Sequence, residues 1–326
     1  MKAVVVGAQG PAVTEAPMPA PKPTEVLVKV HACGLNRADL AVAAGHRHGT
    51  LGGAGTVVGM EWAGVVVQCG AQVPAGLKAG DRVMGSGGAA FAEFTVADYG
   101  RVSPIPSASM SFEQAATLPV ALQTMHDAVI THGQLAAGGS VLIQGASSGV
   151  GLMAMQIARH RGAALVIGSS TDAGRRARLT QFGAHLAIDS RDPGWAAQVL
   201  EATGGRGVDL IVDQVSGGVA NQNMQATRVL GRIVNVGRLG GMKDEFDFDL
   251  HALRRISYIG VTFRTRSVEE VREINARMQA DLGPAIASGQ LNLPIDRVFK
   301  LDEALAALAH MKENKHFGKV VLSVGA

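Results

Sequence analysis

Three glycines, Gly145, Gly149 and Gly151, follow the apolar run Val141–Ile143 with the spacing Gly-x-x-x-Gly-x-Gly. Apolar residues then recur at helical spacing, at positions 150, 154, 157 and 158, and a glycine at position 162 marks the end of the pattern. A strand, a tight turn and a helix N-terminus direct backbone N–H groups and the positive end of the helix dipole at whatever lies above the turn. This arrangement suits the binding of a dinucleotide pyrophosphate. The alternative is a glycine-rich turn with a structural role only.

Each position in this turn has a physical task. Gly145 allows the tight turn, Gly149 allows close approach of a phosphate, and Gly151 allows the helix to pack on the strand. Ser148 and Val150 offer backbone N–H groups to the phosphate. These five residues are the expected cofactor turn.

The residues after the next strand, Ala164–Gly168, indicate which nucleotide the turn prefers. An NAD site usually places Asp or Glu here, about 20 residues beyond the turn, on the ribose hydroxyls. This chain has Ser169, Ser170 and Thr171 instead, with no carboxylate at the strand end to repel a 2′-phosphate. Arg175 follows as the best-placed phosphate partner. We therefore expect NADPH as the cofactor; the alternative for the arginine is a solvated basic helix face.

Strands and helices alternate up to residue 263, which predicts an α/β domain with a doubly wound parallel sheet of about six strands. Beyond the first two, the expected strands are Leu186–Ile188, Val208–Asp213, Gly231–Val236 and Ile256–Thr262. Gly237 follows the fifth strand and Phe263 follows the sixth. Loops at the carboxyl ends of such strands cross the cofactor, so both are candidate cofactor contacts. Phe263 has an alternative role as a core residue.

The segments on either side of this domain lack its alternation of strand and helix patterns. From residue 1 to about residue 111, Gly and Pro divide the chain into short runs of β character, which predicts a small antiparallel barrel. The last segment is irregular and β-like, with one amphipathic helix that begins at Asp302 and a final strand, Lys319–Val324. We expect a nucleotide-binding domain at residues 118–263, inserted between residues 1–117 and residues 264–326 of the barrel domain.

Size and composition exclude several classes of protein. A chain of 326 residues with 42 glycines, 17% charged residues and a net charge of +3 fits an α/β enzyme and predicts neither a nucleic-acid nor a membrane partner. The N-terminus has no signal-peptide pattern, and no apolar run is long enough to span a bilayer. Cys33 and Cys69 are too few for a disulfide framework or a four-cysteine zinc lobe, so we expect a cytoplasmic protein.

Several motifs resemble those of the medium-chain dehydrogenases/reductases over nearly the full length of the chain. The matching stretches are Gly34–Asp39, Gly59–Gly64, Gly80–Val83, Phe91–Val96, Ala115–Pro119, Gly145–Gly151 and Phe317–Val320. Within that superfamily the chain is most similar to the quinone oxidoreductases. Asn36–Asp39, Leu253–Arg266 and Glu313–Lys315 resemble the tumour-suppressor-inducible branch. The resemblance implies a GroES-like barrel domain joined to a Rossmann domain.

Two departures from the zinc alcohol dehydrogenases of the superfamily concern the metal. Those enzymes have a Cys ligand where this chain has Asn36, and a His ligand where it has Met60. An amide and a thioether cannot replace a thiolate and an imidazole at a catalytic zinc, and Glu61 alone does not make a site. Without a Lewis acid, an alcohol is not readily deprotonated for hydride loss. We therefore expect a zinc-independent enzyme with no metal-ligating residues.

The resemblance also implies roles for particular side chains. Asn36 matches a position that contacts the nicotinamide ribose and the substrate carbonyl, although Asn-x-x-Asp is also a local turn-capping pattern. Thr124 matches a position near the nicotinamide; its alternative is an ordinary polar helix residue. Many quinone oxidoreductases have a tyrosine where this chain has Ala41. His46 or His48 is therefore the candidate proton donor, with solvated loop histidines as the alternative.

These features predict NADPH-dependent reduction of a quinone, by hydride transfer from the nicotinamide C4 to an electron-poor carbonyl acceptor. An enone or 2-enoyl reductase, which acts on the conjugated C=C bond, is the alternative with the same fold and cofactor. A nucleotide-binding protein without enzymatic activity is a further alternative. The resemblance also implies a homodimer, formed by edge-to-edge pairing of the last Rossmann strand near Ser257–Thr262.

Overall fold

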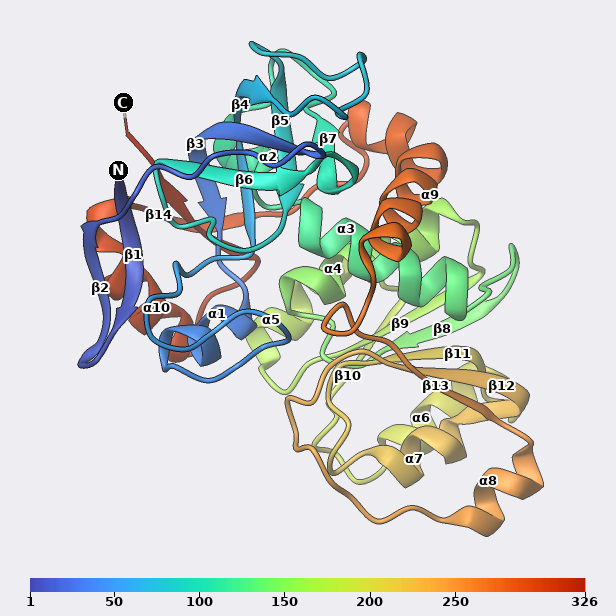
Figure 1. Ribbon diagram of the computed structural model, residues 1–326. Helices are drawn as coiled ribbons and strands as arrows, with labels where there is room; N and C mark the ends of the chain where they lie inside the picture. Colours follow the sequence, from blue (N-terminus) through green and yellow to red (C-terminus); the bar gives the residue numbers. More distant parts are fainter. Residues whose placement is uncertain (326) are drawn as a thin grey trace. The chain divides into compact units, whose positions relative to one another are not determined.

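The computed structural model describes residues 1–325 of the chain, which divides into two compact units (Figure 1). Unit 1 comprises Met1–Gln123 and Phe263–Ala326, and unit 2 comprises Thr124–Thr262. Unit 2 is therefore one continuous segment, inserted between the two pieces of unit 1.

Unit 1 contains a sheet of seven strands among the described residues. The strand order is β14-β15-β3-β4-β5-β7, and β6 also pairs with β3. The bounds are β3 Glu25–Gly34, β4 Glu61–Cys69, β5 Arg82–Ser86, β6 Phe94–Asp98, β7 Val102–Pro104, β14 Ile295–Lys300 and β15 Lys319–Ser323. The pairs are antiparallel, as predicted, except that β14 runs parallel to β15. Two further strands, β1 (Lys2–Gly7) and β2 (Gly10–Glu15), form an antiparallel pair of their own.

The ten-residue strand β3 lies in the middle of this sheet. Val26, Val28 and Val30 are buried in a core that includes Trp62, whereas on the other face Lys29 is exposed, although Leu27 is buried there as well. Side chains two residues apart lie on the same face of a strand, so this alternation fixes which face of β3 packs on the core. The strand ends at Gly34, and the sheet thereby determines where the candidate residue Asn36 lies.

Helix α9 (Val268–Ala287) corrects the expectation that the last segment contains a single helix. Ser267 and Glu270 form a capping box at its N-terminus, each accepting from the backbone N–H of the other. Its inner face is apolar and buried, with Val271, Ile274, Met278, Leu282 and Ile286. These apolar residues recur at helical spacing. The charged outer face and the Gly283–Pro284 pair near the C-terminal end make that spacing difficult to recognise in the sequence. The predicted helix near Asp302 is present as α10 (Ala304–Lys312), preceded by a 3₁₀ turn at Leu301–Glu303.

Unit 2 contains a parallel sheet of six strands in the order β10-β9-β8-β11-β12-β13. The bounds are β8 Ser140–Ile143, β9 Leu165–Ser169, β10 Leu186–Ile188, β11 Val208–Asp213, β12 Thr227–Asn235 and β13 Ser257–Gly260. The predicted α/β class with a doubly wound parallel sheet is confirmed. Two strands, β10 and β11, coincide with their predicted ranges, whereas β12 begins at Thr227 and not at Gly231.

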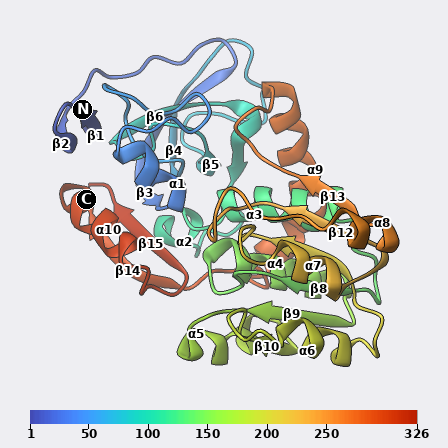
Figure 2. The same ribbon diagram turned by 90° about the horizontal axis from the view of Figure 1, so that it is seen from below.

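Helices lie on both faces of the unit 2 sheet. Helix α4 (Gly149–His160) covers one face, and α6 (Trp195–Ala202) and α7 (Ala220–Ala226) cover the other (Figures 1 and 2). Because the chain proceeds from β8 to β9 and β10 and then returns to β11, the strand order reverses between β8 and β11. Ligands of doubly wound sheets bind outside the carboxyl ends of the strands at such a reversal.

The remaining helices are α1 (Arg37–Ala43), α2 (Phe112–Ala115), α3 (Pro119–His126), α5 (Ala173–Ala177) and α8 (Phe248–Arg254). Among residues 1–325, no helix combines the length and the apolar character that a membrane crossing requires.

Candidate functional site

The predicted cofactor turn follows β8 at the reversal of the unit 2 sheet. Gly145 has a φ of +69°, a left-handed conformation that glycine adopts without strain. Ser148 caps α4, and its Oγ accepts a hydrogen bond from the N–H of Gly151 at 3.1 Å. A Cβ atom on Gly151 would lie 2.7 Å from the carbonyl oxygens of Gly145 and Ala146, so only glycine fits there.

The first residues of α4, Gly149 and Val150, have N–H groups that the helix itself cannot satisfy. Both residues are half-buried, so these donors can reach a ligand above the turn. Free N–H groups and the positive end of a twelve-residue helix are the features that stabilise a phosphate. The turn therefore fits the pyrophosphate of a dinucleotide.

Ser169 supports this turn from the end of the neighbouring strand β9. Its hydroxyl accepts from the N–H of Gly145 at 3.0 Å and lies 2.6 Å from Oε1 of Gln144, to which it donates. The side chain is fully buried. Both hydrogen-bonding directions are thus used inside the protein, and Ser169 shapes the turn without presenting its hydroxyl to a ligand.

Gln214, which sequence analysis missed, connects the turn to the end of β11. Its Nε2 donates to the carbonyl of Gln144 at 3.2 Å, and the Ser148 hydroxyl donates to its Oε1 at 2.8 Å. Gly237 lies beyond β12, and a Cβ atom there would be 2.7 Å from the Gln214 carbonyl oxygen. Three strand ends therefore converge on the turn. No local pattern marks Gln214 in the sequence, because its partner Ser148 is 66 positions away.

The segment after β9 carries the candidate 2′-phosphate contacts. The Ser170 hydroxyl lies 3.0 Å from that of Ser147. Arg175 is half-buried, and its Nε lies 3.8 Å from the carboxylate of Asp172, which caps α5. The N–H of Arg175 is the main reason why the pKa of Asp172 lies below its usual range. A carboxylate, Asp172, therefore lies near the end of β9, and its side chain accepts a hydrogen bond at the N-terminus of α5.

Two further arginines gather beside this segment. Arg176 donates to the Ser170 carbonyl at 2.8 Å and pairs with Asp189 at 3.1 Å. Arg191 donates to the carbonyl of Thr171 and pairs with the same carboxylate at 3.6 Å. Arg191 lies beyond β10, 20 positions from Thr171, and no local pattern in the sequence marks it. Counting Arg175 and Asp172, three guanidinium groups face two carboxylates, and the excess positive charge favours an anionic group.

In unit 1, Asn36 is the N-cap of α1. Its backbone N–H donates to the carboxylate of Asp39 at 2.7 Å, so the local capping pattern suggested by Asn-x-x-Asp is present. The side chain points elsewhere. Its Nδ2 donates to Oε1 of Glu61 at 2.9 Å, and its Oδ1 accepts from Nζ of Lys319 at 3.0 Å. The backbone and the side chain of Asn36 therefore have separate tasks.

Glu61 and Lys319 form a buried ion pair beneath Asn36. Lys319 Nζ contacts Oε1 of Glu61 directly, and both side chains are almost completely buried. The second oxygen of Glu61 accepts from the N–H of Val120, at the start of α3, at 2.9 Å. Buried charges are stable only when they are paired and hydrogen-bonded, which is the case here. In the sequence, Lys319 is recognisable only as part of the motif Phe317–Val320, and its contact with Glu61, 258 positions away, has no local signal.

A catalytic zinc does not fit these side chains. The resemblance described above implies that Asn36 and Met60 replace a Cys and a His ligand, and the Lys319 ammonium already compensates the charge of Glu61. A second cation beside Glu61 would meet that ammonium at close range. Elsewhere, within residues 1–325, no three His, Cys, Asp or Glu side chains are arranged to hold a metal ion.

Asp39 is a second carboxyl group close to this cluster, and it is fully buried. Burial raises its pKa to about 7, and the N–H of Asn36 and the charge of Lys319 oppose the rise only in part. Oδ1 of Asp39 is buried without a hydrogen-bond partner. The carboxyl group therefore changes charge near neutral pH.

The candidate proton donors lie on the loop after α1. His46 is exposed, and His48 is half-buried. Burial, and next the charge of Arg264, lower the pKa of His48. Of the other candidates, Thr124 is half-buried on α3, and Phe263 is half-buried at the residue where the chain re-enters unit 1.

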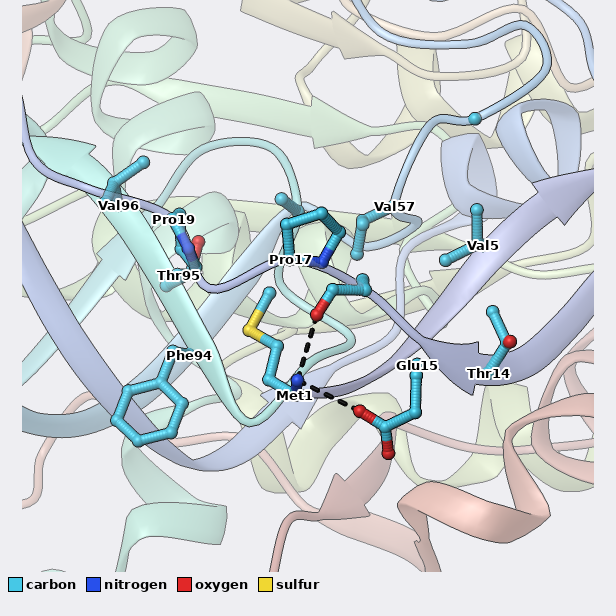
Figure 3. Close-up of a pocket in the computed structure, with 13 residues that line it drawn as sticks. Met1, Val5, Thr14, Glu15, Pro17, Pro19, Val57, Phe94, Thr95 and Val96 are labelled. Carbon is cyan, nitrogen blue, oxygen red and sulfur yellow. Dashed lines mark hydrogen bonds and ion pairs between the residues drawn. The ribbon is translucent and has the colours of Figure 1, made fainter.

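A surface pocket of about 280 Å³ is also present in unit 1 (Figure 3). Its lining is largely apolar and includes Val5, Pro17, Pro19, Val57 and Phe94. None of the candidate residues of unit 1 lines it. The pocket is therefore separate from the Asn36 cluster.

Known protein families match both parts of the chain. Residues 22–107 match the alcohol dehydrogenase GroES-like domain, and residues 149–280 match the zinc-binding dehydrogenase family. Among curated proteins, a phenolphthiocerol/phthiocerol polyketide synthase of Mycobacterium tuberculosis is 31% identical over 306 residues, which is 93% of this chain. The chain spans only 14% of that protein, and 12% of a related highly reducing polyketide synthase from Fusarium pseudograminearum.

Solved structures match the whole chain. A probable oxidoreductase from Mycobacterium abscessus is 30% identical, with a TM-score of 0.81 and 99% of each chain covered. A mycobacterial quinone oxidoreductase is 26% identical, with a TM-score of 0.87 and 99% of each chain covered. A mycobacterial protein in complex with NADPH is also 26% identical, with a TM-score of 0.87, and the match covers 99% of this chain and 100% of that chain. The CurK enoyl reductase is 26% identical, with a TM-score of 0.86 and 99% of each chain covered. The chain is thus an oxidoreductase and belongs to the medium-chain dehydrogenase/reductase superfamily.

Proposed function

We propose that this protein is a zinc-independent, NADPH-dependent reductase of quinones, close to the tumour-suppressor-inducible quinone oxidoreductases. The observation that carries the proposal is the Asn36 amide, held between Glu61 and Lys319. By the resemblance, Asn36 stands at the position of a metal ligand of the zinc alcohol dehydrogenases. A neutral amide can bind a carbonyl oxygen, but it cannot generate an alkoxide from an alcohol as zinc does. Reduction of an electron-poor carbonyl compound suits such a site better than oxidation of an alcohol.

NADPH is the proposed cofactor, and two features support it over NADH. The end of β9 carries Ser169 and Ser170, and the arginines 175, 176 and 191 outnumber the carboxylates around the following segment. A structural relative binds NADPH. The residues proposed to bind the cofactor are Asn36, Thr124, Gly145, Ser148, Gly149, Val150, Gly151, Ser170, Arg175, Gly237 and Phe263. Ser169, which was also expected to contact the cofactor, is proposed to act indirectly by holding the turn.

The proposed tasks of the protein are to anchor, to orient and to exclude water. The N–H groups of Gly149 and Val150 bind the pyrophosphate, and the Asn36 amide binds the acceptor oxygen. When bound, NADPH supplies the hydride. A reduced quinone oxygen is stabilised by delocalisation over its aromatic ring, so little further electrophilic help is needed. The proton is proposed to come from solvent or from a histidine of the loop after α1, His46 or His48.

An enone or 2-enoyl reductase is the second candidate, and the similarity to the CurK enoyl reductase favours it. Both reactions use the same fold and cofactor and differ in the acceptor pocket. The test is oxidation of NADPH by the purified protein with naphthoquinones, phenanthrenequinone and simple alkenones in parallel. Turnover of the quinones supports the proposal, and turnover of the alkenones alone would overturn it. Tight NADPH binding without turnover of any acceptor would indicate a nucleotide-binding protein without enzymatic activity.

The zinc independence and the role of Asn36 have their own tests. Active protein should retain its activity after dialysis against a chelator; stoichiometric zinc that is lost together with activity would contradict the proposal. Asn36→Ala should lower kcat by about 100-fold, the usual effect of removing a donor from a developing oxyanion. The ion pair of Glu61 and Lys319 does not depend on the amide, so the variant should still fold.

A further inference from the structure

The two partners of the Asn36 side chain determine which way its amide points. A lysine ammonium can only donate hydrogen bonds, and an ionised carboxylate can only accept them. Oδ1 must therefore face Lys319, at 3.0 Å, and Nδ2 must face Glu61, at 2.9 Å. The opposite orientation would set a donor against a donor and an acceptor against an acceptor.

This orientation leaves one strong hydrogen-bonding group of Asn36 available. An amide nitrogen has two hydrogens, and Glu61 takes one of them. The backbone N–H is held by Asp39, so the residue is fixed at both ends. Asn36 is half-buried, whereas Glu61 and Lys319 are almost completely buried. The second Nδ2 hydrogen is therefore the donor that this cluster presents to a bound molecule.

We propose that Lys319 is a positioning residue that orients and polarises the Asn36 amide, so that its free Nδ2–H acts as the electrophile for the acceptor oxygen. This inference rests on the proposed function. It assigns to an internal ammonium part of the task that a metal ion performs in the zinc-dependent relatives.

The physical basis is the position of the charge. An ammonium at the carbonyl oxygen of an amide draws electron density toward that oxygen and makes the N–H groups stronger donors. The effect is larger in a buried site, where water does not screen the charge. When the acceptor receives hydride, negative charge accumulates on its oxygen, and a preorganised donor stabilises that charge without reorganisation. The acceptor gains two electrons with the hydride, and water supplies the proton that completes the reduction.

Glu61 makes the arrangement possible. It neutralises the charge of Lys319, and its second oxygen is satisfied by the N–H of Val120. Removing Lys319 alone would leave a buried carboxylate without its cation, and such a variant is expected to fold poorly. The informative variant therefore removes both charges together.

The test compares the wild type with Glu61→Gln/Lys319→Met and with Lys319→Arg, using the conjugated carbonyl acceptor that the wild type reduces fastest. The double variant should bind NADPH with unchanged Kd, as measured by quenching of nicotinamide fluorescence, and should lose roughly 10-fold in kcat, less than the loss on removing the donor entirely. Lys319→Arg retains a cation at this position and should therefore keep most of the wild-type kcat.

A series of acceptors with different reduction potentials separates polarisation from a structural role. Weakly oxidising acceptors depend most on the electrophile, so the double variant should lose more kcat with them than with strongly oxidising acceptors. A wild-type kcat in the double variant, or an equal loss with every acceptor, would overturn the inference while leaving the proposed function in place. Absence of turnover by the wild type with every acceptor would overturn the proposed function and this inference with it.

Discussion

The hydroxyl of Ser169 accepts a hydrogen bond from the backbone N–H of Gly145 at 3.0 Å, which joins the end of β9 to the first residue of the cofactor turn. Gly145 has a φ of +69°, so the peptide that Ser169 holds is the one that makes the turn. The same hydroxyl donates to Gln144, and the side chain is fully buried. Ser169 therefore supports the turn from the protein interior and does not face the ligand side.

Ser169→Ala should lower both the stability and the affinity for NADPH. The substitution leaves the half-buried N–H of Gly145 and the buried Oε1 of Gln144 without their partner, which costs about 2 kcal/mol in the free energy of unfolding. A less well-held turn should raise the Kd for NADPH several-fold. Urea unfolding and fluorescence titration measure the two effects.

Ser170→Ala is the matched control, since the Ser170 hydroxyl contacts the Ser147 hydroxyl and, at 3.5 Å, the carbonyl of Asp172, and lies at the candidate phosphate contact. It should weaken NADPH binding with little change in the free energy of unfolding. Equal stability of the two variants would contradict the supporting role of Ser169.

Arg175→Ala should reduce the affinity for NADPH but not that for NADH. A hydrogen bond between two charged groups contributes about 1.5 kcal/mol or more, so the Kd for NADPH should rise about 10-fold. Arg178→Ala removes the same charge from an exposed position nearby and should change neither affinity. Equal affinities for the two nucleotides in the wild type, unchanged in Arg175→Ala, would contradict NADPH as the preferred cofactor.

Asp39→Asn should change how stability depends on pH. The carboxyl pKa is about 7 in the folded protein and 3.8 in the unfolded chain, so the folded state binds more protons between these values. The contribution to stability is fully present below about pH 4 and is lost as the pH rises through 7, by up to roughly 4 kcal/mol. Asparagine keeps the acceptor for the Asn36 N–H without the charge, so the variant should be the more stable protein above pH 7.

Thermal unfolding of the wild type and Asp39→Asn from pH 4 to pH 8 measures this difference. Asp302→Asn removes a carboxylate from the surface and serves as the control. Parallel curves for the wild type and Asp39→Asn would contradict the titration of a buried Asp39 in this range.

Sequence patterns located the unit 2 strands and the cofactor turn because those signals are local. Strands of a parallel sheet are buried on both faces and form short apolar runs, as Leu210–Val212 of β11 and Val141–Ile143 of β8 do, and Gly145–Gly151 lies between the second of these runs and a helix. The ion pair beneath Asn36 has no such signal. Lys319 is 283 positions from Asn36, and only the pairing of β15 with β3 brings the two together.

Helix α9 shows a different limit. Its Ser267–Glu270 capping box is a clear start signal, but Pro284 and a charged outer face make the helical spacing of the apolar residues that follow difficult to recognise.

Arg191 illustrates the same difficulty as Lys319: it reaches Thr171 only because β10 pairs beside β9. The contacts that could not be predicted from the sequence are therefore mainly those that strand pairing makes between residues far apart in the chain.

The last strand of the unit 2 sheet has a backbone edge that is suited to a second copy of the chain. Within residues 1–325, β13 pairs with β12 alone. Val261 donates its N–H to Asn235 at 3.0 Å, and backbone groups of alternate residues face the same neighbour. The N–H of Gly260 therefore points away from β12, and an unprotected edge of this kind favours association.

Gly260→Pro should convert the proposed homodimer into a monomer. Proline removes the outward N–H without touching the bonds to β12, and a Cβ atom at this position meets nothing within 4 Å, so the fold should be unaffected. Gly260→Ala retains the N–H and should remain a dimer. Sedimentation equilibrium should give twice the 33.6 kDa chain mass for the wild type and Gly260→Ala, and the chain mass for Gly260→Pro. A monomeric wild type at micromolar concentration, or a dimeric Gly260→Pro, would show that this edge does not hold two chains together.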